Sequence, residues 1–81
     1  MSSFITWLDT FVEEKGIDRD EHFDVEGPSG TNVFPMGLVI DTIKQANADE
    51  QAQIKQQLVI LDFQNRDVAA YFKHLAGALA L

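Results

Sequence analysis

Four residues that could bind a cation follow one another at alternate positions in a short acidic segment. The four are Asp18, Asp20, His22 and Asp24. Alternating acidic residues are typical of the calcium loop of an EF-hand, which also requires a glycine at its sixth position and a glutamate at its twelfth. Phe23 and Ser29 stand at those positions here. The segment therefore lacks the pattern of a calcium site, and we expect no bound metal.

Other residue types that could carry a reaction do not form a familiar arrangement either. The two histidines, His22 and His74, have no thiol to join them in a zinc site, because the chain contains no cysteine. The turn at residues 27–31 lacks the lysine of a phosphate-binding P-loop. The serines and threonines show no local arrangement with a histidine base, which nucleophilic catalysis requires. We therefore predict that the protein is not an enzyme and has no catalytic residue or cofactor.

The composition is that of one small folded domain. The chain has 81 residues, of which 46% are hydrophobic and 23% are charged, with five glycines and two prolines. This apolar content is too high for a disordered chain, and the length is below that of two domains. We predict a single domain over residues 1–81. A domain of this size has little room for a substrate cleft of about 300–1,000 Å³.

The acidic charge is concentrated in one part of the chain. The net charge is −7, and eight carboxylates face two basic residues within residues 9–26. Nucleic-acid binding depends on Lys and Arg to neutralise phosphates, so we expect no direct binding to nucleic acid. A concentrated negative field instead attracts basic partners over about a Debye length of ~8–10 Å. The alternative interpretation is a solvated face that keeps the protein soluble.

Targeting features are not evident in the sequence. The start of the chain has no basic region followed by a long apolar region, as a secretory signal would. The longest uncharged apolar run, residues 33–40, is far shorter than the ~20 residues that span a bilayer. With no cysteine for disulfides, these features predict a cytoplasmic protein that does not enter membranes.

Hydrophobic spacing predicts a mainly α fold in which about four helices surround one core. The first helix covers residues 3–15, with a serine cap at Ser2 or Ser3 and a left-handed stop at Gly16. The expected buried positions recur at helical spacing. They are Phe4, Trp7, Leu8, Phe11 and Val12 in the first helix, Met36, Val39, Ile40 and Ile43 in the second, Ile54, Leu58 and Leu61 in the third with Val59 as a further candidate, and Val68, Phe72, Leu75 and Leu79 in the last.

Capping residues set the expected boundaries of the later helices. Pro35 suits the first position of the second helix, and Asn47 its end. Asp49 and Asp67 are expected to cap the third and fourth helices. The run at residues 59–63 is apolar on more than one side, which predicts a segment enclosed by its neighbours.

A short β-hairpin, or else an ordered loop, is expected after the first helix. Residues 22–26 alternate, residues 27–30 are dense in turn formers, and residues 31–34 favour extended structure. A regular hairpin would make the fold a small α+β one. Because an isolated hairpin is marginal in water, some of its apolar side chains must lie against the helices. The candidates are Phe23, Val25, Val33 and Phe34.

The function that best fits these features is a small acidic module for protein–protein interaction, whose partner is a protein with a basic patch. The predicted acidic surface comprises Glu13, Glu14, Asp18, Asp20, Glu21, Asp24 and Glu26. Because aromatic residues are enriched at the centres of interfaces, the candidate anchors are Trp7, Phe34 and Tyr71.

Two alternatives stay open at the level of sequence. In the first, the carboxylates mimic DNA phosphates and inhibit a nucleic-acid-binding protein, as accessory proteins of mobile elements can do. In the second, the chain is a structural domain that self-associates as a homodimer through its C-terminal helix. The residues of that predicted dimer face are Val68, Phe72, Leu75, Ala76 and Leu79.

Overall fold

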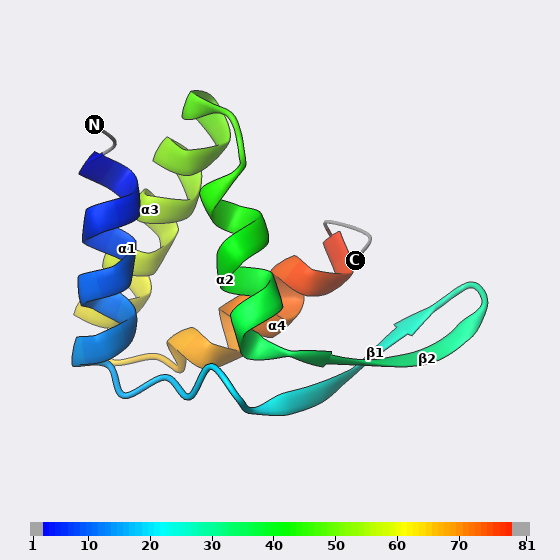
Figure 1. Cartoon of the computed structure of the whole chain (residues 1–81). Coiled ribbons are helices and arrows are strands. Elements are labelled where there is room, and N and C mark those ends of the chain that lie inside the picture. The colour runs from blue at the N-terminus through cyan, green and yellow to red at the C-terminus, as the bar shows by residue number, and fades with distance from the viewer. Residues whose placement is uncertain (1–2, 79–81) are drawn as a thin grey trace.

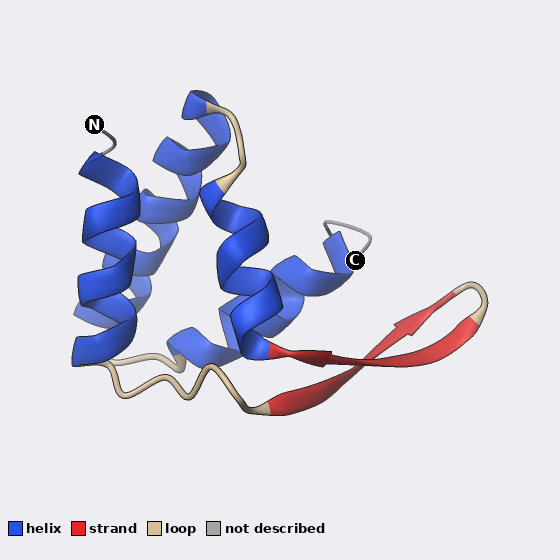
Figure 2. Cartoon of the chain, in the orientation of Figure 1, coloured by secondary structure: helices blue, strands red, loops and turns tan. Residues whose placement is uncertain are grey.

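A computed structural model describes residues 3–78, which form four helices and one hairpin (Figure 1). The elements in chain order are α1 (Ser3–Glu14), β1 (His22–Gly27), β2 (Gly30–Pro35), α2 (Met36–Lys44), α3 (Ala48–Phe63) and α4 (Val68–Ala78). Figure 2 shows the helices gathered together, with the hairpin extending away from them. The prediction of a mainly α fold with a hairpin after the first helix is confirmed.

The core is made of apolar side chains from all four helices. No polar or charged residue within residues 3–78 is buried. Helix α2 is the most enclosed element, because Met36, Val39, Ile40 and Ile43 on it are all fully buried. Six residues of the stripes expected on α1 and α4 are buried, namely Phe4, Leu8, Phe11, Val12, Val68 and Phe72. Trp7 and Leu75, which were also expected to be buried, are half-buried against the core, and Ala76 is buried in addition. Leu79 lies outside the described residues.

The predicted enclosure of residues 59–63 is wrong. Val59 is 49% exposed, Ile60 is 39% exposed and Phe63 is 87% exposed. Ile54 and Leu58 are buried in the core, and Leu61 packs against it. A consecutive apolar run winds around a helix, so only those side chains that follow the 3.6-residue period of the buried stripe can enter a core on one side.

The chain leaves α1 and α3 through the same hydrogen-bonded turn. After α1, Gly16 has a φ of 64°, and the amide of Ile17 donates to the carbonyl of Val12 at 3.1 Å. After α3, Asn65 has a φ of 56°, and the amide of Arg66 donates to the carbonyl of Leu61 at 2.9 Å. This is the Schellman arrangement, which favours Gly or Asn in the left-handed position. The predicted stop at Gly16 is confirmed, while Ser2 lies outside the described residues.

The start of α3 corrects the predicted helix boundary. Helix α2 ends at Lys44, and Asn47 is the cap of α3 rather than the end of α2. Its Oδ1 accepts from the amide of Glu50 at 2.9 Å, and its Nδ2 donates to Oε1 of Glu50 at 2.7 Å. Asn47 therefore caps α3 with its side chain, which also bonds the side chain of Glu50, and Asp49 lies inside the first turn rather than at the cap. Asp67 does cap α4, since its Oδ1 accepts from the amide of Ala69 at 3.0 Å.

The hairpin is antiparallel and closes through the two residues Pro28 and Ser29. Its register pairs Phe23 with Phe34, Asp24 with Val33, Val25 with Asn32 and Glu26 with Thr31. Phe23 and Val25 are half-buried against the core, and Phe34 is also half-buried. Val33 is 59% exposed, so the prediction that it lies against the helices is wrong. The register explains this, because it places Val33 opposite Asp24 on the outward face.

The connector between α1 and the hairpin is bound to the start of α2. Pro35 ends β2 with an extended backbone and caps α2 without a side-chain bond, so it is not the first helical residue as predicted. Two of the free amides of α2 are satisfied by the connector instead. The Met36 amide donates to the Glu21 carbonyl at 2.7 Å, and the Gly37 amide donates to the Arg19 carbonyl at 2.8 Å. These bonds fix the path of the acidic segment relative to the core.

Candidate protein-interaction surface

The predicted acidic surface lies on three consecutive parts of the chain. Glu13 and Glu14 end α1, Asp18, Asp20 and Glu21 lie in the connector, and Asp24 and Glu26 lie on β1. All seven residues are exposed. We keep the name acidic surface for these seven residues.

Hydrogen bonds give the connector part of the acidic surface a defined turn. Oδ1 of Asp18 accepts from the amide of Asp20 at 2.9 Å, and the carbonyl of Asp18 accepts from the amide of Glu21 at 3.2 Å. The Nδ1 of His22 donates to the carbonyl of Asp20 at 2.8 Å. Asp18 therefore has a structural role in addition to its charge, because its side chain holds the turn that presents Asp20 and Glu21.

Most residues of the acidic surface form no ion pair with the described part of the chain. Within the described part of the chain, Glu21 is its single member with an ion pair, and the partner is Lys73 Nζ at 3.5 Å. Carboxylates elsewhere do find partners, such as Asp62, whose Oδ1 lies 2.7 Å from Lys15 Nζ. Of the four cations that form ion pairs in the described part of the chain, three pair with other carboxylates and one pairs with Glu21, so six of the seven residues of the acidic surface keep an unpaired charge.

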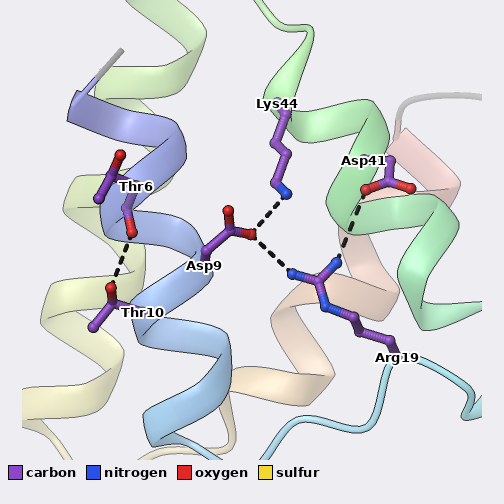
Figure 3. A network of polar contacts seen from close by, with 6 residues as sticks. All are labelled: Thr6, Asp9, Thr10, Arg19, Asp41 and Lys44. Carbon is purple, nitrogen blue, oxygen red and sulfur yellow. Dashed lines mark hydrogen bonds and ion pairs between the residues drawn. The ribbon is translucent and has the colours of Figure 1, made fainter. Parts of the chain in front are cut away.

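The main ion-pair network lies beside the acidic surface and joins three elements (Figure 3). Oδ1 of Asp9 on α1 lies 2.7 Å from Lys44 Nζ on α2 and 2.9 Å from Arg19 Nη2 in the connector. Arg19 also approaches Oδ1 of Asp41 at 3.9 Å. The hydrogen bond from Lys44 has the largest effect on the pKa of Asp9 and lowers it, and desolvation, which raises it, comes next. The charge of Lys44 and the hydrogen bond and charge of Arg19 lower it further, so the pKa of Asp9 lies below its ordinary value. The network therefore links α1 to α2 and to the connector, and the charge of Asp9 is paired with cations.

Two acidic residues of the acidic surface lie at the C-terminal end of a helix, where negative charge is unfavourable. Glu13 and Glu14 lie in the last turn of α1, which contains no basic residue. The C-terminal end of a helix carries a partial negative charge, and a carboxylate there is typically unfavourable by about 0.3–1 kcal/mol. These two glutamates therefore work against the stability of α1.

An open depression of about 420 Å³ lies between α1 and the connector. It is lined by Asp9, Val12, Glu13, Ile17, Asp18 and Arg19. Glu13 and Asp18 of the acidic surface thus share one concave site with the Asp9–Arg19 pair. Glu13 and Asp18 are exposed to solvent, and the third carboxylate of the depression, the half-buried Asp9, is ion-paired with Arg19 and Lys44.

No protein-family model, curated protein or solved structure matches this chain. Over residues 3–78, three or more His, Asp or Glu side chains are nowhere grouped so that they could hold a metal ion. None of the helices in that range is both long enough and apolar enough to cross a membrane.

The three predicted anchors are all half-buried. Trp7 stacks on Phe11 with 5.0 Å between ring centroids, and the Nζ of Lys55 lies 5.3 Å from the Trp7 centroid. Burial raises the pKa of the Tyr71 hydroxyl, and its ring stacks near His74. Phe34 lies opposite Phe23 in the hairpin. None of the three presents a whole ring to solvent.

Sequence reasoning missed the most exposed aromatic residue of the described chain, Phe63. With Val59 and Ile60 it forms an apolar patch on the outer side of α3. Its signal was present in the sequence, because positions 59, 60 and 63 fall outside the stripe of Ile54 and Leu58 when drawn at 3.6 residues per turn.

The face of α4 named for a homodimer is engaged within the chain. Phe72 and Ala76 are fully buried, and Val68 is nearly so. Helix α4 packs against α2 and β1. A dimer through α4 would therefore have to use its exposed residues rather than these three.

Proposed function

We propose that this protein is a non-enzymatic interaction module whose acidic surface docks on a basic patch of a larger protein. The observation that carries the proposal is the distribution of ion pairs. Six of the seven carboxylates of the acidic surface have none among the described residues, whereas three of the other six carboxylates, Asp9, Asp41 and Asp62, each lie within 4 Å of a cation. Unpaired exposed charge of one sign steers a partner of opposite charge and helps to fix its orientation.

Two further features support this function. Glu13 and Glu14 lie at the unfavourable end of α1, which a purely structural role does not explain. The connector is tied to α2 by backbone bonds of 2.7 and 2.8 Å, so the backbone that carries its carboxylates is held in place before binding. Preorganisation of this kind reduces the entropy that is lost on association.

The test compares two variants with the same loss of charge. One is Glu14→Gln/Asp24→Asn/Glu26→Gln, which neutralises part of the acidic surface. The control is Asp41→Asn/Asp49→Asn/Asp67→Asn, which removes as much charge from other exposed sites. Tagged wild type and both variants are used to capture partners from lysate of cells that express the protein, over a series of salt concentrations.

We expect the wild type and the control to retain the same basic partner at moderate salt, and the acidic-surface variant to lose it. Retention of that partner by both variants would contradict the proposal. Release of the partner by duplex DNA would identify the narrower role of a DNA mimic that acts on a nucleic-acid-binding protein.

A further inference from the structure

The outer edge of β1 has backbone groups that no other strand satisfies. The hairpin is a two-stranded sheet in the described part of the chain, so each strand has one open edge. The bond from the Met36 amide to the Glu21 carbonyl continues the ladder by one position. Since hydrogen-bonded and non-hydrogen-bonded pairs alternate in antiparallel sheets, Asp24 and Glu26 fall in non-hydrogen-bonded pairs. Their amides and carbonyls therefore point away from β2.

The side chains of the same two residues define what could pair with this edge. Asp24 and Glu26 are exposed, and neither has an ion pair among the residues described. A third strand would place its side chains about 4.5–5.5 Å from those of Asp24 and Glu26, measured between Cβ atoms. At that separation like charges are destabilising, which disfavours a second copy of β1, and Lys or Arg is favoured.

The opposite face of β1 is apolar. Phe23 and Val25 alternate with the two acidic residues and pack against the core. An added strand would therefore present basic side chains on one face, beside Asp24 and Glu26, and apolar side chains on the other, beside Phe23 and Val25. This alternation follows from the two-residue period of a strand.

The edge of β2 is less suited to the same partner. Pro35 lies on it and has no amide to donate. The residues of β2 that face outward with the acidic pair are Thr31 and Val33, which carry no charge. Acidic side chains and outward-pointing amides therefore occur together along the outer edge of β1 and not along the outer edge of β2.

We propose that the outer edge of β1 binds an extended basic segment of the partner as a third, antiparallel strand, with Lys or Arg facing Asp24 and Glu26. This inference rests on the proposed function and adds the mode of recognition. Backbone bonds along the strand supply affinity in such complexes, and the alternating side chains supply specificity.

The test uses a fluorescently labelled peptide in which lysine alternates with valine, titrated into the full chain and followed by anisotropy. Two matched peptides have the same charge. In one the lysine amides are methylated, and in the other the valine amides are methylated. Because the lysines would lie opposite Asp24 and Glu26, their amides face β1 and the valine amides face away.

We expect methylation of the lysine amides to weaken binding by at least about tenfold and methylation of the valine amides to change it by less than about threefold. Asp24→Asn/Glu26→Gln should also weaken binding of the parent peptide by at least about tenfold, whereas Asp49→Asn/Asp67→Asn should not. On binding, the amide hydrogens of Asp24 and Glu26 should exchange more slowly with solvent.

Two results would overturn this mode of recognition. If all three peptides bind wild type equally and Asp24→Asn/Glu26→Gln releases them, binding is by charge alone, and the proposed function stands without the added strand. If wild type binds the parent peptide no better than Asp24→Asn/Glu26→Gln does, the β1 edge has no role. The proposed function is then judged on the captured partner and the wider acidic surface.

Discussion

The amide nitrogen of Gly37 lies 2.8 Å from the carbonyl oxygen of Arg19, so the backbone of the acidic connector caps the first turn of α2. The most buried helix and the most charged segment are thereby joined directly. A Cβ added at Gly37 would lie 3.2 Å from that same oxygen, closer than an ordinary contact. Glycine at this position allows the two backbones to approach.

Gly37→Ala should destabilise the protein by about 1 kcal/mol, because the added methyl pushes against a carbonyl that bonds the neighbouring amide. Gly77→Ala is the control, since its Cβ would meet Val25 Cγ1 at an ordinary 3.9 Å. It should stabilise the protein by up to about 1 kcal/mol through helix propensity. Urea unfolding measures both, and equal shifts of the same sign would contradict the role assigned to Gly37.

Asp9→Asn should destabilise the protein near neutral pH, because it removes the carboxylate that joins Lys44 and Arg19. The pKa of Asp9 is depressed in the folded state, so its stabilising effect is present above the ordinary pKa of an aspartate. That effect is lost as the pH falls through this value and below. The unfolding free energies of wild type and variant should therefore converge in acid. A difference that is constant with pH would exclude the ion pair as its cause.

Phe63→Gln should change the unfolding free energy by less than about 0.5 kcal/mol, because the ring is 87% exposed and fills no space in the core. Phe72→Ala should cost about 3–5 kcal/mol, since that ring is fully buried. Chemical denaturation of the two variants compares the two phenylalanines directly. A large loss for Phe63→Gln would mean that another surface covers α3 in solution.

Glu13→Gln/Glu14→Gln should stabilise the protein by about 0.3–1 kcal/mol at low ionic strength, because it removes negative charge from the C-terminal end of α1. Asp49→Asn should have the opposite effect, since Asp49 lies in the first turn of α3. Both changes should shrink as salt is added. Thermal unfolding at low and high salt tests the pair, and a loss of stability in the double variant would give Glu13 or Glu14 a structural role.

Along the outer edge of β1, the backbone groups have no neighbouring strand and the carboxylates of Asp24 and Glu26 have no ion pair within the described residues. The hairpin could have been protected by a cation opposite Asp24 or Glu26, yet Val33 and Thr31 occupy those positions. The nearest basic side chain of α4, that of Lys73, pairs instead with Glu21 and lies 5.9 Å from the centroid of Phe23. The charge on the outward face of β1 is therefore available to a partner.

The sequence by itself determined the features that depend on near neighbours in the chain. The stripe of α1, the stop at Gly16, the cap at Asp67 and the hairpin turn all follow from local conformational preference and local hydrogen bonds. Asn47 was assigned to the wrong helix because an asparagine can end one helix or begin another, and its bond to Glu50 decides between them. The order of charged residues in the chain also established the acidic segment at residues 9–26.

Only the tertiary structure decided which side chains are covered and which charges are neutralised. Residues 59–63 have apolar side chains on more than one side of α3; the stripe of Ile54 and Leu58 indicates which side can enter the core, but only the packing shows that Val59, Ile60 and Phe63 stay exposed. The pairing of Asp9 with Lys44 and the bond between Gly37 and Arg19 join residues far apart in the chain. Such contacts depend on how the helices pack, which no local pattern specifies. Because Lys44, Arg19 and Lys73 pair with other carboxylates, Asp24 and Glu26 on β1 have no ion pair within the described residues.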